Sequence, residues 1–190
     1  NLELIAKLQR SVEVEQLQNE RGRALSDENF AKALELTDRL ETMGAPVSVG
    51  EQKEFLRSVI EIERQIDLLQ PQLTSLSSSR LRRSVEKLIS DFNVAADPQK
   101  FGVRVNEKFN KLKLRYDQLS EKVILIVTSD GKSEVRLLPG GRLGTFKEIT
   151  LKVFPGSYKL SARCPGLREK VEPLRIEVGE ASITRHISCI

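Results

Sequence analysis

The feature that most constrains the fold is a change in the spacing of apolar residues at Glu121. Before it, apolar residues recur in alternating steps of four and three, which is a heptad pattern. The clearest run is Phe55, Val59, Ile62, Ile66, Leu69, Leu73 and Leu76. Beyond Glu121 the period becomes 2, which is typical of strands. The 190-residue sequence therefore predicts an α+β protein with a helical part over about 1–120 and a β part over about 121–190.

The helical part carries several more narrow apolar stripes. One comprises Leu2, Ile5, Leu8 and Val12, and another runs from Val105 to Val123. Because a narrow stripe on a charged helix is stable only when it is buried, these helices must pack against each other. A heptad spacing favours a supercoil with a facing helix. We therefore expect an elongated antiparallel bundle or coiled coil of four to five helices, with partners in the same chain or in another copy.

The β part begins with a continuous apolar run, Val123–Val127, which indicates a strand buried on both faces. Asp130-Gly131 follows it, and this dipeptide is a strong hairpin signal. Alternating segments separated by Pro-Gly or Gly-rich turns then continue to the end, giving about six strands. The spacing of these turns predicts a small antiparallel β-sandwich.

Three segments of the β part carry a resemblance to a known family. They are Phe154-Pro155-Gly156-Ser157-Tyr158-Lys159-Leu160, then Cys164-Pro165-Gly166-Leu167, and then Glu172 to Val178 with Gly179-Glu180. In this respect the last 70 residues resemble the PEGA domain family, although Leu167 replaces the usual aromatic residue and the namesake tetrapeptide is absent. The resemblance implies a non-catalytic module of an envelope or surface protein, with Tyr158 pointing into the core. It brings no catalytic residues.

Composition offers little material for catalysis. The chain has one histidine, two cysteines and no tryptophan. His186 lies on the last expected strand, on the face opposite Ile187, where a lone histidine is typically solvated. Nucleophilic catalysis would need a histidine held by a second group, and a zinc site would need about four N or S ligands. We therefore expect no catalytic residue, no metal and no cofactor, and the chain is interpreted as not being an enzyme.

The two cysteines, Cys164 and Cys189, both fall on the expected inward face of their strands. They could form one disulfide, which would imply an oxidising compartment, or stay buried as free thiols. Intact mass before and after reduction distinguishes the two states.

Charge is uneven along the chain, although the net is only +4. Residues 1–70 carry nine lysines and arginines against fourteen aspartates and glutamates, whereas residues 71–190 carry twenty-two against thirteen. The candidate partner-binding residues are the cluster Arg80, Arg82 and Arg83, and Arg142 in an expected glycine-rich loop. Nucleic-acid binding would show a larger basic excess and stacking aromatics. A protein partner or a second copy of the chain is the better expectation.

The function that these features favour is a non-catalytic scaffold or adaptor of a bacterial cell envelope. The helices would provide spacing and self-association, and the β module would dock onto a protein or cell-wall component. We expect a periplasmic, membrane-anchored protein, with any anchor upstream of residue 1 because no run in the sequence is long enough to span a bilayer. The alternative is a cytoplasmic protein that uses its basic region, 71–190, to bind nucleic acid or anionic lipid.

Overall fold

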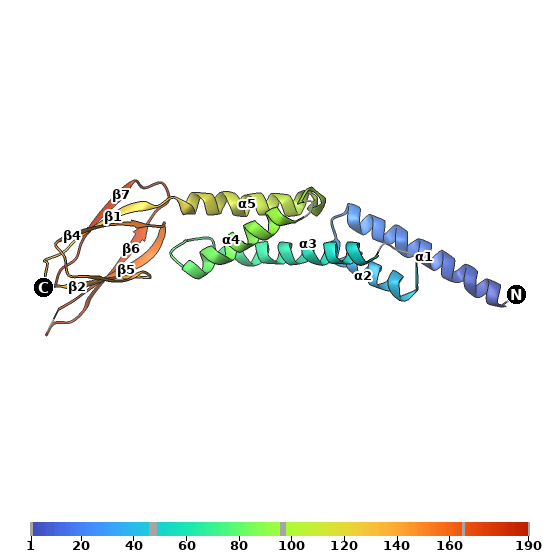
Figure 1. The fold of residues 1–190 in the computed structure, drawn as a ribbon, viewed down its shortest axis with the longest axis horizontal. Coiled ribbons are helices and arrows are strands. Elements are labelled where there is room, and N and C mark those ends of the chain that lie inside the picture. The colour runs from blue at the N-terminus through green and yellow to red at the C-terminus, as the bar shows by residue number, and fades with distance from the viewer. Residues whose placement is uncertain (1, 46–48, 96–97, 165, 190) are drawn as a thin grey trace. The chain divides into compact units, whose positions relative to one another are not determined.

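The computed structural model describes residues 2–45, 49–95, 98–164 and 166–189. Five helices precede two small β-sheets, so the chain is an α+β protein (Figure 1). The helices are α1 (Leu2–Ser26), α2 (Phe30–Thr42), α3 (Val49–Leu69), α4 (Ser79–Val94) and α5 (Gly102–Ser120), with short 3₁₀ turns at Gln70–Gln72 and Pro98–Phe101. The chain divides into two compact units. Unit 1 comprises residues 1–67 with 92–108, and unit 2 comprises residues 68–91 with 109–190.

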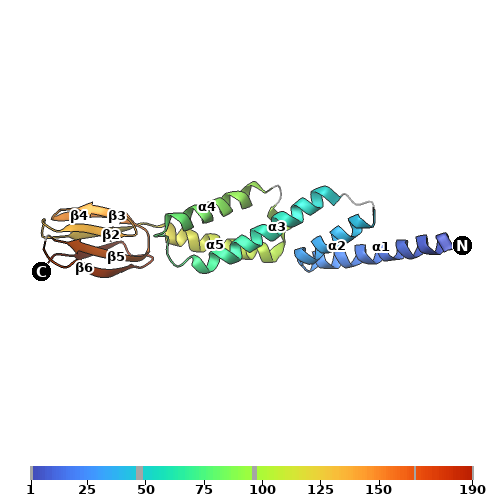
Figure 2. The same ribbon diagram turned by 90° about the horizontal axis from the view of Figure 1, so that it is seen from below.

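In unit 1, helices α1 and α2 lie side by side (Figures 1 and 2). The contact uses Leu17 and Ala24 of α1, both buried, and the buried face of α2. The stripe at the start of α1 is not buried within the described chain, because Ile5, Leu8 and Val12 are at least half exposed. The helix continues through Gly22 to Ser26.

The N-cap of α2 lies later than the sequence indicates. Ser26 and Asp27 are residue types that favour an N-cap ahead of Phe30, but the cap is Asn29, whose side chain accepts a hydrogen bond from the Lys32 amide at 3.1 Å. A side-chain oxygen at this position satisfies one of the free amides of the first turn. The physical reason is that α1 extends to Ser26 and pushes the turn three residues along the chain.

The heptad residues of α3 are buried as expected, apart from Phe55, which is half-buried. Phe55 and Phe92 both contact the ring of Phe101, with ring centroids 5.8 and 5.2 Å apart. Such tilted and edge-on contacts add to the apolar burial. These three rings form the aromatic core of unit 1.

Unit 2 has seven strands in two sheets. Sheet A is mixed, in the order β4-β1-β7, and sheet B is antiparallel, in the order β3-β2-β5-β6. The strands are β1 (Val123–Thr128), β2 (Glu134–Leu138), β3 (Gly141–Gly144), β4 (Glu148–Val153), β5 (Gly156–Arg163), β6 (Lys170–Ile176) and β7 (Ser182–His186). The inward residues of both sheets share one buried cluster, which includes Leu125, Leu160 and Ile187.

Four expectations for the β part need correction. The region is not wholly antiparallel, because β1 pairs with β7 in parallel. Asp130-Gly131 does not close a hairpin, since β1 and β2 belong to different sheets. The segment Gly141–Gly144 is a strand paired with β2 rather than a loop. The run Val123–Val127 is buried on one face only, because Ile124 is exposed.

The change of period at Glu121 coincides with the end of α5 and the start of β1. Pro71 lies at the start of the 3₁₀ turn after α3. At this position the missing backbone N–H removes no hydrogen bond of a helix interior. Ser77 and Ser78 lie in the connection to α4, and Ser79 is the first residue of that helix. Among the helices that the structure describes, none has the length and hydropathy that a membrane span requires.

Candidate functional site

The Pro-Gly turn before β5 contacts the loop that precedes α4, within unit 2. The Pro155 carbonyl accepts hydrogen bonds from the Leu76 amide and from Ser75 Oγ, both at 3.3 Å. A Cβ on Gly156 would lie 1.9 Å from Ser75 Oγ. Gly156 also has a φ of +148°, which side chains rarely adopt. Position 156 therefore requires glycine for two independent reasons.

The same turn is held from the side by cations. The guanidinium of Arg82 lies 4.5 Å from the centre of the Phe154 ring, and the ammonium of Lys122 lies 5.1 Å from it. Arg82 also donates a hydrogen bond to the Leu76 carbonyl. Arg82 was predicted as a partner-binding residue. In the structure the Arg82 side chain makes contacts within the chain, and these contacts connect the start of α4 to the turn.

Tyr158 completes this junction from the β5 side. Its ring is buried in the common core, and its hydroxyl donates a hydrogen bond to the Phe154 carbonyl at 2.8 Å. Burial raises the pKa of the phenol above its usual value, because the charged form is desolvated. The inward tyrosine implied by the PEGA resemblance is thus present, with its hydroxyl bonded within the turn.

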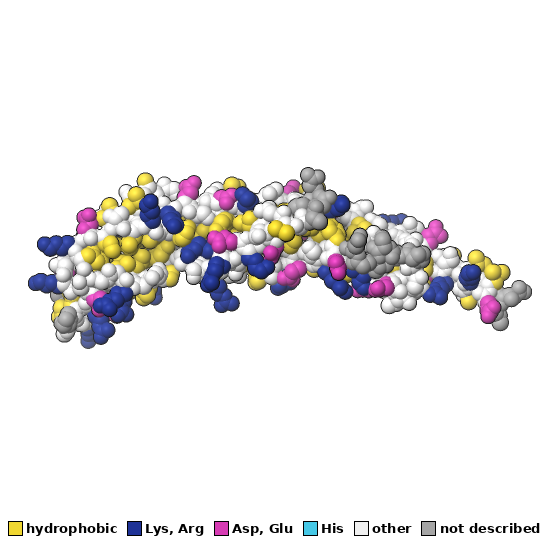
Figure 3. Space-filling view, in the orientation of Figure 1, with side chains coloured by type: hydrophobic (Ala, Val, Ile, Leu, Met, Phe, Trp, Pro, Cys, Tyr) yellow, Lys and Arg dark blue, Asp and Glu magenta, His cyan; other side chains and the backbone are white. Residues whose placement is uncertain are grey.

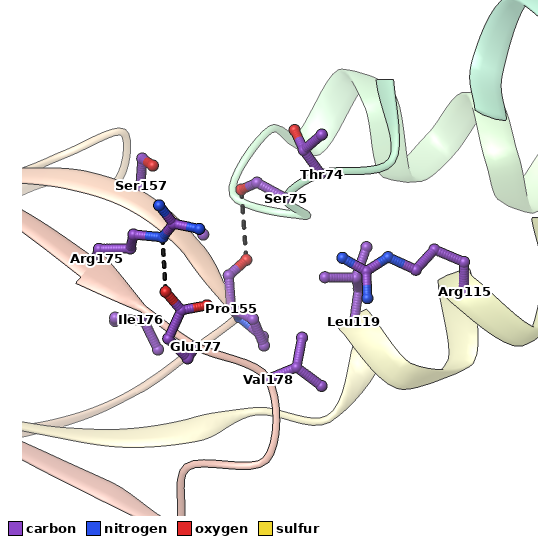
Figure 4. A pocket seen from close by; sticks show the side chains of 11 residues that line it. Thr74, Ser75, Arg115, Leu119, Pro155, Ser157, Arg175, Ile176, Glu177 and Val178 are labelled. Carbon is purple, nitrogen blue, oxygen red and sulfur yellow. Dashed lines mark hydrogen bonds and ion pairs between the residues drawn. The ribbon is translucent and has the colours of Figure 1, made fainter. Parts of the chain in front are cut away.

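A cavity of about 290 Å³ opens beside the junction (Figure 4). Arg115 of α5 and Arg175 of β6 approach it from opposite sides, and Leu119 and Val178 line its apolar wall. Arg115 donates to the Leu73 carbonyl at 3.3 Å. Arg175 is paired with Glu177 at 2.7 Å, whereas the partner of Arg115 is an uncharged carbonyl, so the cavity keeps one positive charge. No histidine or cysteine lines this cavity.

The other candidate arginines are placed in two different elements. Arg80 and Arg83 lie exposed on the first turns of α4. Arg142 lies on β3 and forms an ion pair with Glu134 of β2, with Nε 3.1 Å from Oε1. The glycines around Arg142, which we expected to form a loop, lie in β3, and this is why its side chain has a fixed direction.

Glu134 is the centre of an arginine cluster that the sequence did not reveal. Arg136 Nη2 lies 3.1 Å from the same Oε1 oxygen that Arg142 contacts. Hydrogen bonding to Arg136, with the added charges of Arg142, Arg136 and Arg163, lowers the pKa of Glu134. Arg163 is opposite Glu134 in the β2–β5 register. The signal was missed because these arginines come from three strands, 27 positions apart in sequence at the extremes.

Cys164 and Cys189 form a disulfide that joins the end of β5 to the segment after β7. It therefore connects sheet B to sheet A. The buried Ser133 hydroxyl lies 3.2 and 3.3 Å from the two sulfur atoms, and it donates to Asp130. A disulfide at this place points to an oxidising compartment outside the cytoplasm.

The one histidine of the sequence lies at the end of β7. His186 is exposed, and its Nδ1 lies 3.0 Å from Thr128 Oγ1. Within the described residues, no group of three or more His, Cys, Asp or Glu side chains has the arrangement of a metal site. Pro165, part of the second turn of the resemblance, lies outside the described residues. The neighbouring Leu167 amide closes that turn onto the Cys164 carbonyl at 3.2 Å.

Comparison with protein-family models gave no match for this chain. Comparison with curated proteins gave none either. The functional argument therefore depends on the residues themselves.

Proposed function

We propose that the chain is a non-catalytic scaffold or adaptor of a bacterial cell envelope. In this proposal the helices form an antiparallel bundle that sets distance and brings copies together, and the β region is a PEGA-like module that docks onto a protein or wall component. The compartment we propose is the periplasm.

The observation that carries the proposal is the junction at Pro155 and Gly156. Residues that carry the PEGA resemblance contact the Ser75–Leu76 loop. The Pro155 carbonyl accepts two hydrogen bonds from this loop, and Gly156, which has no side chain, lies close to Ser75. Within unit 2 the β strands are thus attached to helical segments by a specific contact rather than by a free linker. A module that is fixed in this way suits a scaffold, because the position of its binding surface is then defined.

Two further features support the proposal. The Cys164–Cys189 disulfide fits a protein of an oxidising compartment. The apolar residues Leu4, Ile5, Leu8 and Val12 form a stripe that the described chain leaves largely exposed on α1. A stripe of this kind on a helix favours association with another helix.

The first experiment measures the oligomeric state by light scattering across a range of concentrations. We expect a dimer or larger assembly, and we expect the double variant Ile5→Glu/Leu8→Glu to be monomeric. Leu114→Glu is the matched control, because Leu114 is equally exposed on α5. It should leave the assembly unchanged. A wild-type chain that is monomeric throughout would contradict the self-association part.

The second experiment tests the compartment. In cells of the source organism, free thiols are blocked at the moment of lysis and disulfide thiols are then counted by a mass-shifting reagent. We expect Cys164 and Cys189 to be protected as a disulfide. Free thiols in the cell would contradict the periplasmic assignment.

A further inference from the structure

The outer face of sheet B collects residues of one charge. Strand alternation and register place eleven residues on the same side of the sheet. We call this side the basic face, and its residues are Glu134, Arg136, Leu138, Arg142, Ser157, Lys159, Ser161, Arg163, Val171, Pro173 and Arg175. Figure 2 looks onto these strands, and in Figure 3 lysine and arginine side chains gather along the edge of the β region where Figure 1 places β2 and β5.

Five of these eleven residues are cations and one is an anion. Arg136 and Arg142 share Glu134, and Arg175 pairs with Glu177 just beyond β6. Lys159 has no ion-pair partner in the part of the chain that the structure describes. Arg163 acts on Glu134 only through its charge. The basic face therefore keeps an excess of positive charge that the chain itself does not neutralise.

The Glu134 cluster shows which chemistry fits this face. One carboxylate is held by hydrogen bonds from Arg136 and an ion pair from Arg142, with Arg163 as a third neighbour. Three guanidinium groups around one carboxylate leave room for a second carboxylate, because each guanidinium can donate to two oxygens. A cavity of about 390 Å³ adjoins the cluster, lined by Lys132, Glu134 and Arg163 among others.

Ser161 marks an unsatisfied position in the middle of the basic face. It lies opposite Arg136 and Val171 in the register, and its side chain points away from the shared core because Leu160 and Ala162 belong to that core. Only 2% of it is exposed, and its Oγ has no hydrogen-bond partner among the described residues. A buried hydroxyl without a partner is uncommon, and a ligand on the face could supply one.

The apolar residues of the face narrow the class of ligand. Leu138 and Val171 are about half exposed, and both lie on the basic face beside the cationic residues. The eleven residues include no aromatic side chain, so the face lacks the stacking platform that single-stranded nucleic acids use. A peptide that carries both carboxylates and small apolar groups matches both the charged and the apolar positions.

From this charge complementarity we propose that the basic face binds an acidic, partly apolar segment of a partner protein. The proposal rests on the docking role assigned above to the β region, and it names the surface and the chemistry of the partner. Carboxylates of the segment bind to Arg142, Arg163 and Lys159, and its apolar side chains contact Leu138 and Val171.

The experiment uses the full oxidised chain and a fluorescent peptide that alternates glutamate with valine. Fluorescence anisotropy should show binding that weakens as salt is added, because surface ion pairs are screened. A peptide with glutamine in place of glutamate should not bind. Arg163→Gln and Lys159→Gln should each weaken binding about threefold, as expected for exposed ion pairs. Glu134→Gln should tighten it by a similar factor, because it removes the competing carboxylate.

The matched control is Lys152→Gln on β4, an exposed strand lysine of sheet A, and it should leave the affinity unchanged. Tighter binding to vesicles of phosphatidylglycerol or to a single-stranded oligonucleotide would overturn the proposal, as would equal effects of Lys152→Gln and Lys159→Gln. If Arg163→Gln instead abolished self-association, the occupant would be a second copy, and the proposal of a separate partner would be wrong.

Failure here is distinguishable from failure of the proposed function. A chain that assembles and keeps its disulfide in cells, but does not bind the peptide, overturns the docking face alone. A monomeric chain with free thiols overturns the scaffold proposal, whatever the peptide does.

Discussion

The two sheets of unit 2 share one core but present very different outer faces. The outward residues of sheet A are mainly small and uncharged, with one lysine and one glutamate: Ile124, Ile126, Thr128, Glu148, Thr150, Lys152, Ser182, Thr184 and His186. The outer face of sheet B carries five cations. Because both sheets fold against the same apolar cluster, folding alone does not require this difference.

The comparison separates two kinds of constraint on a strand. Inward positions, such as Leu125 and Leu160, must fill a common interior. Outward positions are not bound by this packing requirement, so we ascribe the concentration of arginines on sheet B to the binding proposed above. The following tests measure how strongly the two sheets depend on each other and whether the charges matter for stability. Because the chain lacks tryptophan and both tyrosines lie in unit 2, tyrosine fluorescence reports on that unit.

The largest effect should come from cutting the covalent connection between the sheets. Replacing both cysteines in Cys164→Ser/Cys189→Ser removes a crosslink with a sequence separation of 25 residues. Loss of this constraint should lower the free energy of unfolding by about 3 kcal/mol, because the unfolded chain gains freedom. Urea unfolding followed by tyrosine fluorescence measures the change. Reduced wild-type protein is the control and should match the variant; an unchanged midpoint would mean that the sheets hold together without the bond.

Next in size is Gly156→Ala at the start of β5, where sheet B meets the Ser75 loop. The new methyl group would collide with Ser75 and force an unfavourable φ, so we expect a loss of about 2 kcal/mol. The double variant Gly156→Ala/Ser75→Gly should recover part of it, since the side chain in the way is gone. Additive losses in this cycle would show that the two residues do not touch.

A smaller, pH-dependent effect should come from Asp130, in the connection between sheet A and sheet B. Hydrogen bonds from the amides of Ser133 and Lys132 lower its pKa from 3.8 to about 2. Because the folded-state pKa is depressed, the stabilisation is present above about pH 4 and is lost as the pH falls towards 2. Acid titration of tyrosine fluorescence should show a shallower loss in Asp130→Asn. Equal slopes in the two proteins would contradict this role.

The smallest effect should come from the outward lysines. Lys159→Gln on sheet B and Lys152→Gln on sheet A should each change the free energy of unfolding by less than about 0.5 kcal/mol, since both side chains are exposed. Thermal unfolding of the pair makes the comparison directly. If only Lys159→Gln were destabilising, the charge of the basic face would serve folding rather than binding.

The sequence predicted those features that depend on neighbours in the chain. The period change at Glu121 and the buried heptad residues of α3 follow from local spacing, and the inward Tyr158 is implied by the resemblance of its turn to the PEGA family. The early stripe of α1 shows the limit of this reasoning. Spacing tells which residues could be buried, but not whether a partner helix lies opposite Ile5 and Leu8.

Features that depend on strand pairing could not be read from spacing. Asp130-Gly131 has the composition of a hairpin turn. The Asp130 carboxylate, however, accepts hydrogen bonds from the amides of Lys132 and Ser133, and the chain continues into the other sheet. Likewise, the Glu134 cluster draws Arg136, Arg142 and Arg163 from β2, β3 and the end of β5. Only the register brings them together, so the candidate list from sequence held Arg142 without its neighbours.

The parallel pairing of β1 with β7 also sets an order of events during synthesis. β1 leaves the ribosome first among the strands, but one of its edges stays open until residues 182–186 have emerged. The partner strand β7 is therefore synthesised last among the strands. The entropic cost of closing the long segment between β1 and β7 is incurred in the final folding step. A ribosome that stalls before Ser182 would hold a nascent chain with an unpaired, apolar strand edge, the state most open to capture by a chaperone.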